Sequence, residues 1–230
     1  MTFDNFYAGN SYAFEVAGAK RISEQPGGEY NPLIICGPCG VGKTHLLSAI
    51  SARTSALQTN YKIICTSAEA FVEELISSIR EGKIASFREE YSAADMFLID
   101  NFELLSEKEY TQEELFKIFD CYAKNNKQIV LCVSGHPSEC DFAQKIKSRL
   151  SCGIVLNMAL PNNETKIAII DGVAKEWNLE LDTQIVHCIA EKMNTASEIK
   201  GVLKNIKMAK EINNQYPSLE DLKKRLAQLQ

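Results

Sequence analysis

The chain has 230 residues, of which 45% are hydrophobic and 24% are charged, a composition typical of globular proteins. No apolar run approaches the ~20 residues that a transmembrane helix needs, and the first residues lack the basic and then apolar organisation of a signal peptide, so we expect a cytoplasmic protein. The net charge of -5 argues against a broad, sequence-independent grip on nucleic acid and leaves a small local contact open.

Eight cysteines are scattered along the chain, and two of them, Cys36 and Cys39, have a CxxC spacing. Such a spacing occurs in zinc sites and in redox sites. However, no second CxxC and no nearby histidine completes a metal set, and both residues fall within a glycine-rich segment. We therefore favour reduced thiols over a zinc site or a disulfide scaffold.

Short apolar segments alternate with helical patterns through the first 160 residues. In chain order, strands are expected at residues 33–36, 62–65, 96–99 and 128–133, and helices at 44–52, 68–79 and 111–125. Ser67 is well placed to cap the second of these helices. Uninterrupted apolar strands separated by helices predict a parallel sheet covered by helices on both faces, an α/β fold.

The pattern changes after residue 160, where only helices are predicted. They are expected at residues 164–178, 182–193, 196–213 and 218–229. Pro161 and the asparagines beside it form a plausible boundary. We therefore expect an α/β domain over residues 1–160 and a small all-helical domain over residues 161–230.

The clearest motif is a phosphate-binding loop of the pattern GxxxxGK[ST], formed by Gly37, Pro38, Cys39, Gly40, Val41, Gly42, Lys43 and Thr44. Its glycines let successive backbone N–H groups point at phosphate oxygens. Lys43 reaches the outer phosphates, and Thr44 offers its hydroxyl to Mg²⁺. Because the motif follows an expected strand and opens an expected helix, we favour it over an ordinary glycine turn. We expect ATP (or ADP) and Mg²⁺ to bind here, with His45 included in the site.

The carboxylate that holds the magnesium in such proteins usually ends another apolar strand. Asp100 supplies it after 97–99, although it could instead cap the segment that follows. Asn101 stands where many P-loop ATPases place a second carboxylate, and an amide cannot accept a proton from water. Glu103 could substitute, or its side chain could face solvent on an extended segment. We therefore predict tight binding and slow hydrolysis, a weak ATPase at most.

Two further residues are candidates for sensing the phosphates. Ser134 follows the fourth strand, at the end of the sheet where ligands of open α/β folds gather, and a simple turn serine is an equal interpretation. Arg149 is a candidate arginine finger, supplied in trans to the γ-phosphate of a neighbouring subunit. Taken in isolation, it would be a solvated surface residue.

Together these features resemble the AAA+ ATPase domain of the DnaA family of bacterial replication initiators. The most specific similarity is the string from Ser106 to Glu114, and the resemblance runs nearly end to end. It also includes the N-terminal segment 2–6, the segments 30–33, 97–100 and 147–150, an insertion made of 71–76, 80–83 and 87–91, and a lid that starts at 164–166.

The resemblance implies an AAA+ nucleotide-binding α/β domain followed by a helical lid. The adenine would lie between the lid and residues 6–9, which include Phe6 and Tyr7. Family members assemble head to tail with ATP at the subunit boundaries, and Arg149 matches the position of the trans-acting finger. The insertion from Phe71 to Arg88 would contact single-stranded DNA. Other implied partners are a full-length initiator, a helicase or the sliding clamp.

Three positions depart from the family pattern. Asn101 replaces a second aspartate, and Ser134 is usually aspartate, followed by Gly135 where arginine is common. Ser197 stands where the lid normally offers an arginine to the phosphates. Losing that arginine removes a charge-assisted contact, which is worth about 1.5–3 kcal/mol in general. These departures weaken the expectation of ATP-dependent lid closure.

Our leading hypothesis is an ATP-switch module of replication initiation. The first alternative is a regulatory adaptor that binds nucleotide without significant turnover, and the second is a helicase loader, which shares the AAA+ core. A small-molecule kinase is disfavoured because few arginines follow Arg88. From the sequence we expect neither a helix-turn-helix domain after Gln230 nor a helicase-interaction domain before Met1. The sequence therefore fits either the ATPase domain of a longer initiator or a short divergent relative, and we favour the relative.

Overall fold

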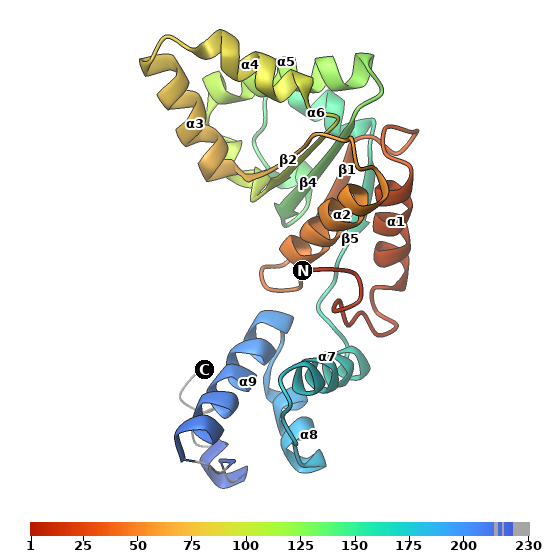
Figure 1. Cartoon of the computed structure of the whole chain (residues 1–230), viewed down its shortest axis with the longest axis vertical. Coiled ribbons are helices and arrows are strands. Elements are labelled where there is room, and N and C mark those ends of the chain that lie inside the picture. The colour runs from red at the N-terminus through yellow and green to blue at the C-terminus, as the bar shows by residue number, and fades with distance from the viewer. Residues whose placement is uncertain (214–215, 218, 223–230) are drawn as a thin grey trace. The chain divides into compact units, whose positions relative to one another are not determined.

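The computed structural model describes residues 1–213, 216–217 and 219–222, which group into two compact units. The first unit contains residues 1–6, 14–38 and 43–158, and the second contains residues 7–13, 39–42 and those from 159 onward. In Figure 1, the first unit is a sheet flanked by helices, and the second contains α7, α8 and α9. The functional division at residues 160 and 161 stays a prediction.

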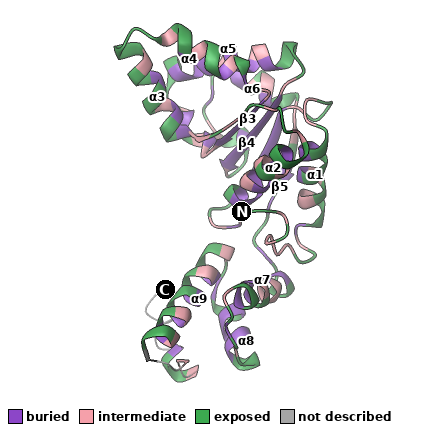
Figure 2. Cartoon of the chain, in the orientation of Figure 1, coloured by how far each residue is buried: buried purple, intermediate pink, exposed green. Residues whose placement is uncertain are grey.

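The first unit is built on a parallel sheet of five strands in the order β2-β3-β4-β1-β5. The strands are β1 Leu33–Gly37, β2 Ile63–Ser67, β3 Met96–Asp100, β4 Gln128–Ser134 and β5 Ile154–Asn157. Strand β1, between β4 and β5, is buried along its whole length, and Figure 2 shows the same burial for the middle of the sheet. This burial explains why the central strands are continuous apolar runs.

Helices cover the sheet of the first unit. They are α1 Ala13–Glu24, α2 Lys43–Leu57, α3 Ala68–Arg80, α4 Ile84–Ala93, α5 Glu109–Lys124 and α6 Gln144–Ser151, with 3₁₀ turns η1 Phe102–Leu105 and η2 Pro137–Glu139. On one face, α3 to α6 pack with alternate strand residues such as Ile34 and Phe97 into one core. Phe71 is fully buried in this core, and its ring lies 5.5 and 5.1 Å from the ring centroids of Phe87 and Tyr91. Such aromatic pairs add about 1 kcal/mol each beyond the area they bury.

The second unit packs α7 Asn163–Glu176, α8 Thr183–Lys192 and α9 Ala196–Asn213 around an apolar core. Ile170, Ile189 and Leu203 are fully buried in that core. The cap residue Asp182 accepts a hydrogen bond of 2.9 Å from the backbone of Gln184, which satisfies one of the unpaired N–H groups at the start of a helix. Among the described helices, none combines the length and the apolar character required to cross a membrane.

The predicted α/β architecture, a parallel sheet with flanking helices followed by a helical part, is confirmed. The four predicted strands are present, and β5 was not predicted because it has four residues of which Ile154 is half-buried and Val155 exposed. Helices α1, α4 and α6 were not predicted either. The last helix, expected at 218–229, lies largely outside the described residues, of which 219–222 are helical.

Candidate functional site

The sheet order brings three chain segments together at the carboxyl ends of the strands. Asp100 ends β3, Ser134 ends β4, and Gly37 ends β1. β4 lies between β3 and β1, and Ser134 is in register with Gly37. Ligands of open parallel sheets bind at this end of the strands. The structure therefore brings these sequence candidates to the expected part of the first unit.

The loop from Gly37 to Gly42 has the backbone conformation that only glycines adopt easily. Gly40 and Gly42 have φ values of 79° and 116°, where a side chain would be strained. A Cβ atom on Gly37 would lie 2.1 Å from the carbonyl oxygen of Met158. The glycine spacing of the motif therefore has a direct steric reason. Within the second unit, the carbonyl of Gly40 accepts a hydrogen bond of 3.1 Å from the backbone of Ser197.

Lys43 is a buried cation that bonds to uncharged partners. Its Nζ donates to the carbonyl oxygens of Gly37 at 2.7 Å and Pro38 at 2.9 Å, and the residue is 8% exposed. In the described part of the chain, no carboxylate forms an ion pair with it. A buried ammonium gains more from an anion than from carbonyl dipoles. Its position at the start of α2 therefore suits a phosphate.

Thr44 and Asp100 form a hydroxyl–carboxylate pair beside this lysine. Thr44 Oγ1 donates to Asp100 Oδ2 at 2.6 Å, and Asp100 Oδ1 accepts from the backbone of Asn101 at 2.9 Å. Oxygen ligands of this kind fit Mg²⁺, which usually takes one or two protein groups together with substrate phosphates. The described residues contain no group of three or more His, Cys, Asp or Glu that could form a metal cage. The donor set thus fits a metal shared with a nucleotide.

Asn101 is directed toward the first turn of α3. It has a φ of 54°, a left-handed conformation that asparagine tolerates better than most residues. Its Nδ2 donates to Glu69 Oε1 at 3.3 Å. Hydrogen bonds with its own backbone N–H and with Ser67, and to a smaller extent with the Asn101 amide, lower the pKa of Glu69.

Glu103 does not lie on an extended segment, as one interpretation of the sequence had it. It belongs to the 3₁₀ turn η1, which the fully buried Phe102 and Leu105 anchor. Its Oε2 accepts a hydrogen bond of 3.0 Å from the backbone of Ser134. This half-buried carboxylate therefore faces the end of β4.

His45 and Phe6 connect the N-terminal segment to α2. His45 Nε2 lies 2.9 Å from the carbonyl oxygen of Thr2 and 3.0 Å from Asn5 Oδ1, and its ring packs edge-on against Phe6 at 5.1 Å. Tyr7 lies in the second unit, where it packs against the helical core. Burial, followed by the charge of Glu176, raises the pKa of Tyr7. Phe6 and Tyr7 thus have different neighbours, although both were predicted to contact adenine.

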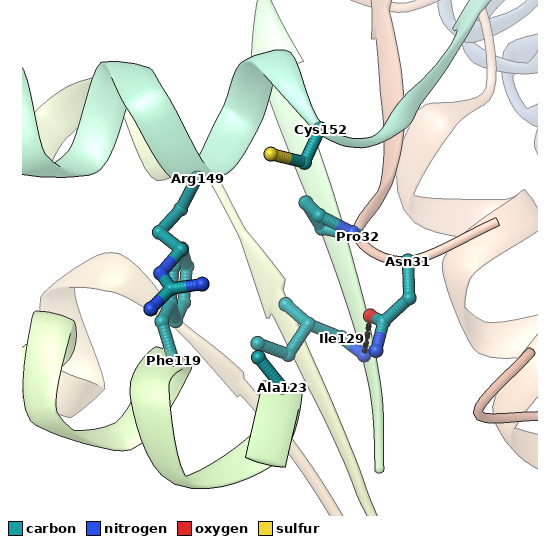
Figure 3. Close-up of a pocket in the computed structure, with 7 residues that line it drawn as sticks. All are labelled: Asn31, Pro32, Phe119, Ala123, Ile129, Arg149 and Cys152. Carbon is teal, nitrogen blue, oxygen red and sulfur yellow. Dashed lines mark hydrogen bonds between the residues drawn. The ribbon is translucent and has the colours of Figure 1, made fainter. Parts of the chain in front are cut away.

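Arg149 lies on α6, with its side chain directed toward α5. Its guanidinium donates to Asp120 Oδ1 at 2.5 Å and lies 5.7 Å from the centroid of the Phe116 ring. With Phe119 and Cys152 it lines a pocket of about 80 Å³, which Figure 3 shows. Its side chain is 35% exposed. The described contacts of Arg149 are with α5, and its role as a finger that acts on another subunit stays a prediction.

All eight cysteines are free thiols in this structure. Burial raises the pKa of Cys36, and it raises that of the fully buried Cys132 further. Both are therefore protonated and poor ligands or nucleophiles at neutral pH. Cys39 is exposed on the loop.

A family model for the bacterial DnaA ATPase domain matches residues 1–157. The chromosomal replication initiator protein DnaA of Borrelia garinii subsp. bavariensis is 35% identical over 215 residues, which cover 93% of this chain and 44% of that relative. The DnaA of a Thermoanaerobacter species is 36% identical over 204 residues, which cover 88% of this chain and 46% of that relative. The chain therefore spans less than half the length of these relatives.

Solved structures of the same family are similar over almost the whole chain. Domain III of the Thermotoga maritima replication initiation protein DnaA has a TM-score of 0.92 and 30% identity, covering 96% of this chain and 93% of that chain. AMPPCP-bound DnaA from Aquifex aeolicus has a TM-score of 0.84 and 34% identity, covering 90% and 65%. A DnaA bound to AMPPCP and single-stranded DNA has a TM-score of 0.82 and 35% identity, covering 93% and 67%. The chain belongs to the bacterial DnaA ATPase-domain family.

Proposed function

We propose that this chain is a cytoplasmic ATP switch of DnaA-type replication initiation, which binds ATP (or ADP) with Mg²⁺ at the loop from Gly37 to Thr44. The observation that carries this proposal is the arrangement around Lys43, a buried cation on loop carbonyls beside the Thr44–Asp100 pair. The family membership and the AMPPCP-bound relative support it.

Each residue of this arrangement has a role in binding. Lys43 exchanges its two carbonyl partners for the outer phosphates, and the loop N–H groups with the start of α2 receive the remaining phosphate oxygens. Thr44 and Asp100 would hold Mg²⁺, which would neutralise charge on the phosphates. Asn101 and Ser134 offer no charged group to the γ-phosphate, so we expect turnover to be slow.

A second copy of the chain is the proposed partner in assembly, with Arg149 directed at the ATP of its neighbour. Arg149 is held by Asp120, which also pairs with Lys124 at 2.6 Å. Partly exposed ion pairs of this type contribute about 1 kcal/mol or less. The guanidinium can therefore leave Asp120 for a triphosphate at small cost.

Single-stranded DNA is the proposed ligand of the insertion formed by α3 and α4, in line with the DNA-bound relative. Val72 and the cations Arg80 and Lys83 lie on this segment. Lys83 pairs with Glu81 at 2.7 Å, and both side chains are more than half exposed. Such a pair exchanges readily for a phosphate. Because the whole chain is acidic, we expect each subunit to bind DNA weakly and to gain strength from assembly.

A single-turnover assay tests the proposal. The purified chain is mixed with a trace of radiolabelled ATP and Mg²⁺, and bound nucleotide and conversion to ADP are followed together. We expect saturable binding that excess unlabelled ATP displaces, with conversion far slower than binding. If no ATP is retained, the proposed function is wrong.

Assembly is tested on the same material by light scattering with single-stranded DNA and ATP. Arg149→Ala should abolish ATP-dependent growth in size and leave ATP affinity unchanged, whereas Lys124→Ala, which removes the other cation beside Asp120, should do neither. Equal assembly by the two variants would contradict the role of Arg149.

A regulatory adaptor is the second candidate. The observation in its favour is the residue at position 101. Asn101 donates to Glu69 and is directed at α3, and its amide cannot accept a proton from water as a carboxylate does. If labelled ATP stays intact on the protein for hours and assembly does not depend on it, the adaptor is favoured over the switch.

A further inference from the structure

The turn after β3 carries a carboxylate whose position is fixed from both sides. Glu103 lies between Phe102 and Leu105, which are fully buried. Phe102 stacks on Phe119 with centroids 6.1 Å apart and an interplanar angle of 13°. These buried anchors hold the turn that carries Glu103 against the core of the first unit.

Glu103 is connected to the P-loop through the end of β4. Its Oε2 accepts the backbone N–H of Ser134 at 3.0 Å, and Ser134 is in register with Gly37. The carbonyl of Gly37 in turn accepts from Lys43 Nζ at 2.7 Å and from the backbone of Gly135 at 3.4 Å. The carboxylate is thus one strand away from the lysine that we expect to hold the outer phosphates.

The other acidic groups at this end of the sheet have different partners. Asp100 is bonded to Thr44, and Glu69 is bonded to Asn101 at the start of α3. Glu139 accepts the backbone N–H of His136 at 3.3 Å as part of the capping box of η2. Glu103 differs from them in its partner, because its Oε2 accepts from the backbone of Ser134, the residue in register with Gly37 of the P-loop.

We propose that Glu103 is the general base of ATP hydrolysis in this chain and takes the role that a carboxylate at position 101 would have. The inference rests on the proposed ATP site. An attacking water gives a proton to Glu103 as its oxygen bonds to the γ-phosphorus, and the bond from that phosphorus to the oxygen of the β-phosphate breaks. ADP and inorganic phosphate form, and the proton leaves Glu103 for phosphate or solvent. No oxidant, reductant or further reactant is needed.

The same geometry accounts for slow turnover. A base placed at 101 would lie directly beside the metal-binding Asp100, whereas Glu103 lies in the next turn, η1, where its Oε2 is already bonded to the backbone of Ser134. The chain therefore keeps a base, in a less effective place.

The test compares Glu103→Gln with the wild-type chain in two measurements. In single turnover with Mg²⁺ and ATP, conversion to ADP should fall by about 100-fold or more, while the Kd for ATP stays within about threefold. The second measurement is binding of Mg²⁺, ADP and aluminium fluoride, which together imitate the phosphoryl group in transfer with its attacking water. That affinity should fall by about tenfold or more in the variant.

Two matched controls keep the result specific. Glu107→Gln removes an exposed carboxylate just after the same turn, and Glu139→Gln removes the carboxylate beside Gly135. Both should convert ATP at the wild-type rate. The role of Glu103 is overturned by any of three results. Glu103→Gln could convert ATP at the wild-type rate, Glu139→Gln could lose as much activity as Glu103→Gln, or the wild-type chain could convert ATP no faster than buffer alone.

The binding data separate this inference from the function on which it rests. If the wild-type chain binds ATP and only the rate comparison fails, Glu103 is not the base and the ATP site stands. If Glu103→Gln folds but loses ATP binding, the residue holds the loop in place and the catalytic role is overturned. If the wild-type chain itself binds no ATP, the proposed function fails.

Discussion

Two polar clusters of the α/β unit use the same residue types in opposite ways. At the carboxyl ends of the strands, Lys43 bonds to loop carbonyls and Asp100 to a hydroxyl and a backbone amide. Between α4 and α5, Glu114 accepts two hydrogen bonds of 2.7 Å from Arg88 and one of 2.7 Å from Lys117.

The difference lies in the charge of the partners. The buried ammonium of Lys43 has neutral partners, which a phosphate can replace with a gain in free energy. The Glu114 side chain is 2% exposed and already pairs with two cations. A ligand that displaced Arg88 or Lys117 would leave this buried carboxylate without a partner, which costs free energy. One cluster is therefore suited to binding and the other to holding α4 on the domain.

Lys43→Met should have the largest effect on binding. It removes the charge that meets the outer phosphates, so we expect ATP affinity to fall by about 100-fold. Lys117→Met is the matched control, since it removes the lysine of the closed cluster, and its ATP affinity should stay within about twofold. Equilibrium dialysis with a non-hydrolysable ATP analogue measures both. Equal losses would show that the two clusters do not differ in the way described.

Glu114→Gln should have the largest effect on stability. Its loss leaves the Arg88 guanidinium, 43% exposed, without its carboxylate. We expect the free energy of unfolding in urea to fall by about 2 kcal/mol, with ATP affinity unchanged. Glu113→Gln, which removes an exposed neighbour on the same helix, should lower it by less than about 0.5 kcal/mol. A loss of ATP binding in Glu114→Gln would show that the Glu114 cluster and the nucleotide site are coupled.

The same pair predicts how stability depends on pH. Hydrogen bonds from Arg88, ahead of those from Lys117, hold the pKa of Glu114 at about 2, below the ordinary 4.5. Because the pKa is lower in the folded state, the stabilisation is fully present above pH 4.5 and is lost as the pH falls toward 2. The stability difference between wild type and Glu114→Gln should therefore shrink below pH 4.5 in a series of urea titrations. A constant difference would contradict the pairing.

Asp100→Asn should have a moderate effect that depends on magnesium. The amide keeps the shape of the side chain and loses the charge that ligates the metal, so we expect ATP affinity to fall by about tenfold in Mg²⁺. With EDTA present, the variant and the wild-type chain should bind ATP equally. Asp95→Asn, just before the same strand, controls for the loss of one negative charge. If the variant still bound ATP more weakly than the wild-type chain in EDTA, Asp100 would not act through the metal.

Local patterns explain why part of this molecule is predictable. The glycine spacing of the P-loop, the apolar runs of β1, β3 and β4, and the Ser67 cap all arise from residues close in sequence. The conformations they require, positive φ at the glycines and an unpaired N–H at the helix start, are properties of a few neighbouring residues. The fold class follows from them because alternating strands and helices have few ways to pack.

Contacts between distant segments explain why the rest is not predictable. Asn101 reaches Glu69 across 32 residues, and Glu103 reaches Ser134 across 31. No periodicity in the sequence encodes either bond, since each depends on which strands become neighbours. Helix α6 was missed for a related reason, because its eight residues bury only Ile146 and Leu150 and the apolar pattern is short.

Ser67→Ala should have the smallest effect. It tests whether the start of α3 is coupled to the nucleotide site. The Ser67 side chain accepts a hydrogen bond of 3.2 Å from the backbone of Ala70, and its Cα is in register with Asp100. Losing a cap costs about 1 kcal/mol of stability, measurable in urea, and Ser77→Ala later in α3 controls for a lost hydroxyl. ATP affinity should not change, because Asp100 is bonded to Thr44 and Asn101 and to no atom of Ser67. A weaker ATP affinity would mean that the start of α3 positions Asp100, and that insertion and nucleotide site are coupled through Glu69 and Asn101.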